Sequence, residues 1–127
     1  MSDILVPLSP GELLDKITIL EIKQARLEDA AKRANVVAEL AALTEIAGPA
    51  MKDAAALLAQ LKMVNEALWD IEDRIRDKER QAAFDGEFIE LARSVYITND
   101  RRADLKRQIN LALHSALVEE KSYTPYV

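Results

Sequence analysis

Apolar residues recur in alternating steps of three and four along two long stretches of the chain. The first stretch spans roughly residues 54–80 and the second roughly residues 85–115. This spacing places the apolar side chains on one face of a helix, as in the seam of a coiled coil. Because only a short loop separates the stretches, with Asp85 as the expected N-cap, we predict two long antiparallel helices. The repeating residues are Leu57, Leu61, Val64, Leu68, Ile71 and Ile75 in the first stretch and Phe88, Leu91, Val95, Thr98, Arg102, Leu105, Ile109 and Ala112 in the second.

The N-terminal part of the chain predicts two shorter helices. Ser9-Pro10-Gly11-Glu12 reads as a capping box, so the first helix is expected to begin at Pro10 and to fray near residues 27–31. Its apolar residues fall on more than one face, which indicates that neighbouring helices or a second chain surround it. Asn35 is the expected cap of the second helix. Gly48-Pro49 is its expected end, because Gly accepts the left-handed conformation and Pro interrupts a helix.

The predicted fold class is therefore all-α. It is a helical bundle built on the long antiparallel hairpin, with two shorter N-terminal helices. Residues 1–8 contain Pro7 and are expected to form an extended arm. Residues 118–127 are expected to form a tail whose two tyrosines can fold back onto the bundle. No linker or repeat divides the chain, so we predict a single domain over residues 1–127.

The composition disfavours several classes of function. The chain has no cysteine and a single histidine, His114, which excludes Cys-type zinc sites and disfavours a His-based catalytic triad. A formal net charge of −5 disfavours binding to nucleic acid. The chain lacks an apolar run of the ~20 residues that span a bilayer, and its start does not resemble a signal peptide. We therefore predict a cytoplasmic protein with no membrane span.

Carboxylates at helical spacing lie on the predicted face opposite the seam. They are Glu66, Asp70, Asp73 and Asp77. Carboxylates on one face can bind a divalent cation. Because Arg74 and Lys78 interleave with them, we interpret this stripe as a solvent-exposed face. The sequence predicts no metal and no cofactor.

Polar residues interrupt the seam of the long hairpin at about the same height. In the expected pairing, Asn65 lies opposite Arg102, and Glu72 lies close to Asn99. One interpretation is a pocket for a carboxylate or phosphate, with Glu72 available as an acid or base. The interpretation we favour is that buried polar pairs fix the register of the two helices. The candidate polar cluster or ligand pocket comprises Asn65, Trp69, Glu72, Arg76, Tyr96, Asn99, Arg102 and Lys106.

The first predicted helix carries a second group of candidate polar residues. They are Glu12, Asp15 and Lys16. Glu12 and Lys16 stand four residues apart and can pair on the surface. Asp15 and Lys16 lie between apolar residues, so one of them can point inward. We interpret the group mainly as a solvated face.

Four segments resemble a known family of short bacterial proteins that is classed only as a domain of unknown function. The segments are SPGELLDKITILEIK, NEALWDIEDRIR, ARSVYITNDRR and VEEKSY, and the resemblance extends over nearly the whole chain. It implies an all-helical protein and an accessory role in surface-polysaccharide biosynthesis. It supplies no catalytic residues.

Two functions are compatible with these patterns. The first is a non-catalytic interaction or oligomerisation module, which forms a homo-oligomer, preferably a dimer, or binds a protein partner. The long seam, the first helix with its several apolar faces and the missing catalytic motifs favour it over an enzyme. The alternative is a small helical enzyme or anion-binding protein, similar in architecture to helical chorismate mutases, with its pocket in the seam of the long hairpin.

Overall fold

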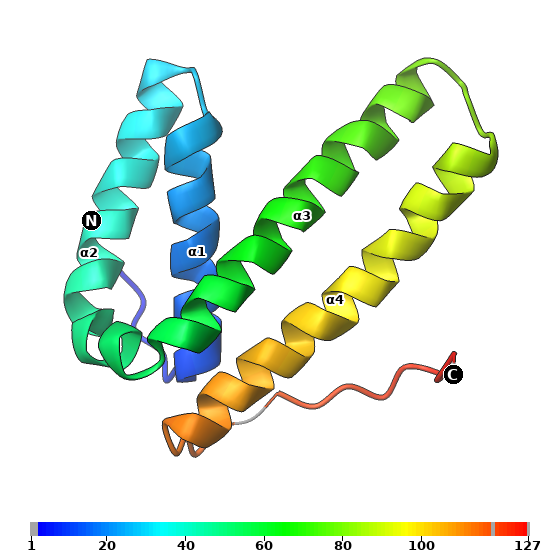
Figure 1. Ribbon diagram of the computed structural model, residues 1–127. Helices are drawn as coiled ribbons and strands as arrows, with labels where there is room; N and C mark the ends of the chain where they lie inside the picture. The colour runs from blue at the N-terminus through cyan, green and yellow to red at the C-terminus, as the bar shows by residue number, and fades with distance from the viewer. Residues whose placement is uncertain (1–2, 118, 127) are drawn as a thin grey trace.

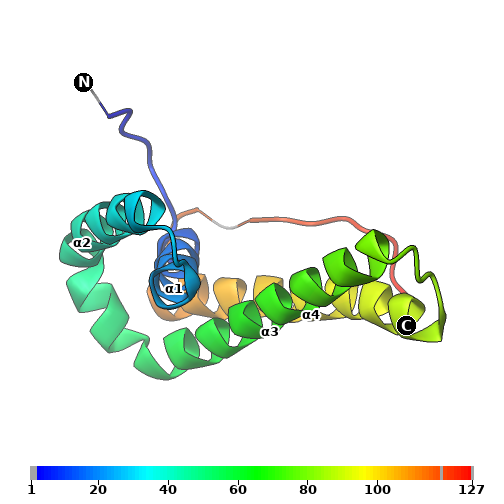
Figure 2. The same cartoon turned by 90° about the horizontal axis from the view of Figure 1, so that it is seen from above.

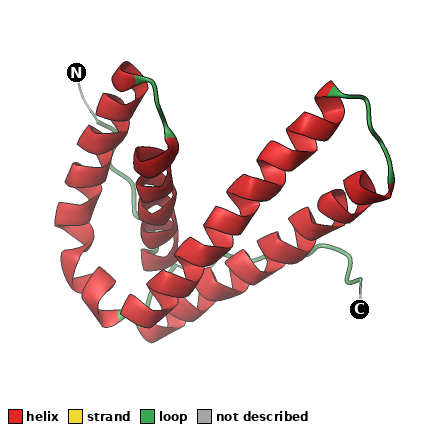
Figure 3. Cartoon of the chain, turned by 45° about the horizontal axis from the view of Figure 1, so that its top comes forward, coloured by secondary structure: helices red, strands yellow, loops and turns green. Residues whose placement is uncertain are grey.

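Four helices form the protein. The computed structural model describes residues 3–117 and 119–126. The helices are α1 (Pro10–Arg26), α2 (Ala30–Asp53), α3 (Ala55–Arg80) and α4 (Gly86–Ala112), and the described residues contain no strand. Figure 1 shows them as two helical hairpins, α1–α2 and α3–α4, that diverge from a common base like the arms of a V. Figure 3 shows the same all-helical arrangement from another side. The prediction of an all-α fold built on a long hairpin is confirmed.

Helix α1 lies at the centre of the arrangement. It begins at Pro10 as predicted, because Ser9 Oγ accepts a hydrogen bond from the Glu12 N–H at 3.3 Å. It packs against each of the other three helices (Figure 2). This position explains why α1 is apolar on more than one face: Leu14, Ile17, Leu20 and Ile22 are all buried.

Helix α2 differs from its prediction at both ends. Asp29, and not Asn35, is the N-cap: its Oδ1 accepts a hydrogen bond from the Lys32 N–H at 2.9 Å. The helix also continues through Gly48-Pro49 to Asp53, so the predicted end at these two residues is wrong. Proline removes one helical hydrogen bond and favours a bend, but neighbouring turns can hold the helix together. Alanine, the strongest helix former, stands at Ala47, on the N-terminal side of this pair, and at Ala50, on its C-terminal side.

Helices α3 and α4 follow the prediction closely. Helix α3 ends at Arg80, and Asp85 caps α4 by accepting a hydrogen bond from the Phe88 N–H at 3.0 Å. The two helices run antiparallel along their whole length (Figure 1). Helix α4 ends at Ala112, about three residues before the predicted end, and His114 beyond it has a positive φ of 55°.

The apolar core is concentrated where α1 crosses the base of the α3–α4 hairpin. Its fully buried members are Leu14, Ile17, Leu61 and Ile109. We call residues 55–65 and 102–112 the inner hairpin, and residues 66–101 the outer hairpin. The outer hairpin extends past α1 on one arm of the V (Figure 1) and contains one buried residue, Leu91.

Both ends of the described part of the chain are non-helical. Residues 3–8 are extended in character and exposed, with Ile4 and Leu5 almost fully accessible. The C-terminal segment 119–126 runs back beside α4, and the rings of Tyr96 and Tyr126 meet edge to face at 5.2 Å. The expected fold-back of the tail is therefore present in the described part of it.

No helix in the described ranges has the length and apolar character needed to cross a membrane.

Candidate functional site

A buried carboxylate, Asp15, lies where α1, α3 and α4 meet. Its Oδ1 accepts hydrogen bonds from Asn65 Nδ2 and Arg102 Nε, each at 2.9 Å. Its Oδ2 accepts a second bond from Arg102 Nη2 at 2.5 Å. This two-bond fork is the strong, orienting geometry of an arginine–carboxylate pair. The hydrogen bonds that Arg102 donates to Asp15 raise the pKa of Arg102 above its already high usual value.

Thr18 completes this network one turn along α1. Asn65 Nδ2 donates to Thr18 Oγ1 at 2.8 Å, and Thr18 Oγ1 donates to the backbone carbonyl of Asp15 at 2.7 Å. Asp15, Thr18 and Asn65 are all at least 95% buried. Among the described residues, no buried side-chain nitrogen or oxygen lacks a hydrogen-bond partner. We call Asp15, Thr18, Asn65 and Arg102 the buried network.

The buried network has the properties of a structural device. It joins three helices at one level, and its polar atoms satisfy one another, so little hydrogen-bonding capacity remains for a substrate. A satisfied polar network in a core favours one alignment of the helices, because sliding any helix would leave buried groups unpaired. The geometry therefore supports the register interpretation over a catalytic pocket in the seam.

A second contact fixes the start of α1 against the C-terminal part of α4. The Gly11 N–H donates to Asn110 Oδ1 at 2.7 Å. A Cβ atom at position 11 would lie 2.5 Å from the carbonyl oxygen of Lys106 and 2.8 Å from Asn110 Oδ1, so only glycine fits this approach. Beside it, Lys106 Nζ pairs with Glu12 at 2.6 Å and with Glu119 at 3.4 Å.

Trp69, Glu72 and Arg76 lie outside the buried network but line, with Asn65 and Arg102, a surface groove of about 380 Å³ beside α1. Asn65 and Arg102, predicted to lie opposite each other, meet through Asp15. Glu72 and Arg76 form an exposed pair along α3 at 3.3 Å, and the ring of Trp69 lies under the guanidinium of Arg26 at 5.8 Å. These contacts do not join the buried network.

The interpretation of the α1 polar group as a mainly solvated face is right for two residues and wrong for the third. Lys16 reaches α2 and pairs with Glu39 at 2.8 Å, and Glu12 is partly exposed. Asp15 points inward and is the centre of the buried network. Asp15 stands between Leu14 and Ile17 on a helix that is apolar on several faces, so an inward position was open to it.

The sequence patterns missed two residues of these contacts, Thr18 and Asn110. Thr18 stands three residues after Asp15, the spacing at which side chains on a helix are neighbours. Asn110 follows the seam residue Ile109 directly, which gives no periodic signal of burial. Its role depends on the crossing of α1 over α4, which the sequence alone does not place.

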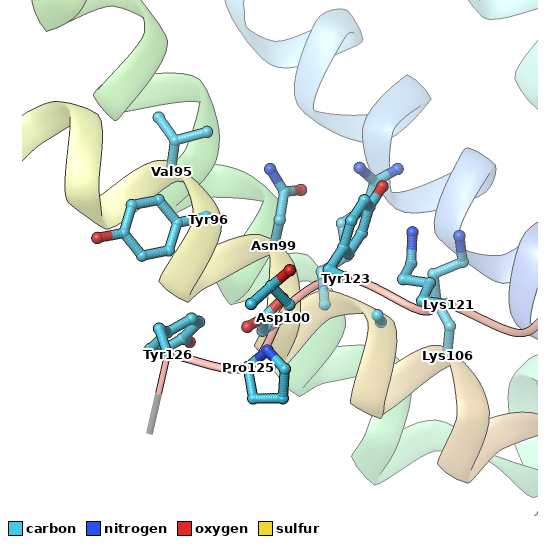
Figure 4. Close-up of a pocket in the computed structure, with 12 residues that line it drawn as sticks. Val95, Tyr96, Asn99, Asp100, Lys106, Lys121, Tyr123, Pro125 and Tyr126 are labelled. Atoms are coloured by element: carbon cyan, nitrogen blue, oxygen red, sulfur yellow. The ribbon is translucent and has the colours of Figure 1, made fainter.

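Four of the candidates, Arg102 among them, also line a groove on α4. The groove has a volume of about 810 Å³ and lies between α4 and the C-terminal segment (Figure 4). Tyr96, Asn99 and Lys106 line its α4 side, and Tyr123 and Tyr126 come from the tail. A hydrogen bond with Asp100 raises the pKa of Tyr126, and the ion pair with Lys121 lowers the pKa of Glu119.

The carboxylates of the described residues do not assemble a metal site. No group of three or more His, Asp or Glu residues in residues 3–117 and 119–126 has the arrangement to hold a metal ion. In the acidic stripe on α3, Asp70 pairs with Arg26 at 2.5 Å and Asp77 pairs with Arg80. These pairs agree with the interpretation of the stripe as a charged surface.

Comparison with known proteins identifies one family. The model of a family described as "Family of unknown function (DUF6165)" matches residues 4–127. This match confirms the resemblance to an uncharacterised family. A comparison with curated proteins gives no match, and a comparison with solved structures gives none.

Proposed function

The chain belongs to the DUF6165 family, whose function is unknown, and we propose that it is a non-catalytic module that assembles with a second copy of itself. The observation that carries this proposal is the incomplete burial of the outer hairpin. Of residues 66–101, Leu91 alone is buried. In the described part of the chain, no third helix covers this segment along its length: Arg26 of α1 reaches Asp70 and Trp69, and the C-terminal segment reaches Tyr96.

The outer hairpin nevertheless has the sequence of a core-forming element. Ile71 and Ile75 continue the apolar spacing of α3, and Phe88 and Val95 continue that of α4, yet all four are only half-buried. Other apolar side chains there are more open: Phe84, Ile89 and Ile97 are 57%, 55% and 46% exposed. Burying each such side chain contributes about 1–2 kcal/mol, so a partner that covers them gains a substantial driving force.

A second copy is the partner that the geometry supports best. Two outer hairpins packed face to face give a four-helix arrangement, which is the standard way to bury such faces. The contact would be isologous, because each copy presents the same surface to the other. Charged residues of both signs flank the faces, such as Arg74 and Glu87, which already pair at 3.0 Å within one copy. Because both signs of charge flank the faces, two copies can pack with opposite charges, and not like charges, facing each other.

The size of the outer hairpin sets the expected strength of the dimer. Its helices are about 23 Å long and together about 20 Å wide. Such a face is at the small end of specific interfaces, which bury about 800 Å² per partner. We therefore expect a dimer that dissociates on dilution. The accessory role in surface-polysaccharide biosynthesis implied by the sequence resemblance stays a prediction beside this proposal.

Light scattering after size exclusion and sedimentation equilibrium test the proposal. The wild-type chain of 14.2 kDa should reach the dimer mass as its concentration rises. Ile89→Glu should weaken the dimer by about tenfold or more, because it places a charge in the buried contact. Ile89 is exposed in the single chain, so this change should leave the monomer folded.

Ile46→Glu provides the matched control. Ile46 is 72% exposed on α2, away from the outer hairpin, and its substitution should leave the dimer unchanged. A wild-type chain that remains a monomer at millimolar concentration would refute the proposal. Dissociation by Ile46→Glu with no effect of Ile89→Glu would also refute it, because the contact would then involve α2.

A further inference from the structure

We propose that the groove between α4 and the C-terminal segment binds a small cyclic organic anion. The carboxylate or phosphate of the ligand would meet Lys106 and Lys121, and its ring would pack against the tyrosines. This inference goes beyond self-association, although Tyr96, Asn99 and Asp100 of the groove belong to the outer hairpin.

The aromatic residues of the groove are the first support. All three tyrosines of the chain line it: Tyr96 from α4, and Tyr123 and Tyr126 from the C-terminal segment. These three residues are 44%, 75% and 53% exposed, so their side chains are accessible from the groove and from solvent. Tyrosine combines an apolar ring with a polar hydroxyl, which suits contact with a ring that also carries polar groups. Figure 4 shows Tyr96 and Tyr126 close together near one end of the groove.

The charges of the groove are the second support. The chain as a whole has 22 acidic and 17 basic residues, yet the groove lining has three cations, Arg102, Lys106 and Lys121, and one carboxylate, Asp100. Carboxylates outside the lining pair with these cations: Asp15 with Arg102, Glu12 with Lys106, and Glu119 with both lysines, so a ligand anion would have to displace Glu119. Lys106 is held at the wall, with its side chain 11% exposed. Asn99 adds an amide that can donate to an anion.

The C-terminal segment already places an anion at these lysines. Glu119 pairs with Lys121 Nζ at 3.0 Å and with Lys106 Nζ at 3.4 Å. A single carboxylate therefore bridges both cations. A ligand carboxylate or phosphate can take the same place, and Glu119 would then compete with it. The volume of about 810 Å³ is within the range of small-molecule sites.

Titration of the full chain followed by amide NMR tests this inference. The probes are phenyl phosphate, inorganic phosphate and benzyl alcohol. Together they separate the contribution of the ring to binding from that of the charge. Phenyl phosphate should cause saturable shifts of the amide signals of residues 95–106 and 121–126. It should bind about three to ten times more tightly than inorganic phosphate, because ring contacts add to the ion pair. Benzyl alcohol should bind most weakly.

Two substitutions should change the affinity for phenyl phosphate in opposite directions. Glu119→Gln removes the competing carboxylate and should tighten binding by about two- to fivefold. Lys121→Gln removes a cation and should weaken binding by a similar factor. Lys52→Gln on α2 removes an exposed cation far from the groove and should have no effect.

Three results would overturn the inference. The first is an absence of saturable shifts in both the wild type and Glu119→Gln. The second is a set of shifts that falls outside the groove. The third is equal weakening by Lys121→Gln and Lys52→Gln, which would show that only the overall charge matters.

Discussion

The inner and outer hairpins are continuous parts of the same two helices, yet they are stabilised in different ways. In the inner hairpin, α1 covers α3 and α4, so Leu61 and Ile109 are fully buried and Asn65 can bind Asp15. In the outer hairpin the same apolar spacing continues past the end of α1, and Leu91 alone is buried. The difference shows that apolar periodicity specifies which face of a helix can be buried, while a third element decides whether it is buried.

The sharpest test of this comparison is a matched pair of large-to-small substitutions. Leu61→Ala in the inner hairpin should destabilise the chain by about 3 kcal/mol, because it leaves a cavity in a closed core. Ile75→Ala in the outer hairpin should cost about 1 kcal/mol, since its side chain is half-solvated. Urea unfolding at low protein concentration, where self-association is minimal, measures both. Equal losses at the two positions would contradict the distinction between the halves.

The buried network offers a second test, because it occurs only where α1 covers the hairpin. Asp15→Asn keeps the shape of the side chain but removes the charge that faces Arg102. We expect a loss of about 2–3 kcal/mol, below the range for fully buried pairs because Arg102 is partly exposed. The control is Asp70→Asn, which breaks the exposed pair between Arg26 of α1 and α3 and should cost less than about 1 kcal/mol. If the buried network had no structural importance, Asp15→Asn and Asp70→Asn would both lower the free energy of unfolding by similarly small amounts.

The close approach of α1 to α4 gives the third and smallest effect. Gly11→Ala should destabilise the chain by about 2 kcal/mol, because the new methyl group would collide with the backbone at Lys106. Gly48→Ala is the matched control: nothing lies within 4 Å of a Cβ there, and alanine should stabilise α2 by about 0.5–1 kcal/mol. Thermal unfolding shows whether each substitution raises or lowers the Tm. A stabilising Gly11→Ala would show that α1 does not lie tightly against α4.

The sequence was sufficient for the elements whose signals are local. The start of α1 depends on Ser9 and Pro10, and the start of α4 depends on Asp85, so side chains within three residues determine these boundaries. The end of α2 was predicted wrongly because Pro49 is a strong local signal that the surrounding helix overrides.

The candidate site was predicted less completely, for a physical reason. Asn65 and Arg102 could be placed at one level, because the pairing of two antiparallel helices follows from their loop. Their shared partner, Asp15, could not be assigned, since this needs the position of α1 across the hairpin. Asn110 was missed for the same reason, because its partner is the backbone of Gly11. The groove depends on where the C-terminal segment lies, which no periodic pattern encodes.

The bonds that hold α1 in place also constrain when the fold can be completed. Gly11 and Asn110 are 99 residues apart in the chain, and Asp15 and Arg102 are 87 residues apart. During synthesis the α1–α2 hairpin can form early from local contacts, but the side of α1 that packs on α4 stays open until α4 has emerged. Closing such long loops comes late in folding and slows it. The nascent chain therefore exposes the side of α1 that later packs on α4 for most of its synthesis, which is the condition under which chaperones bind.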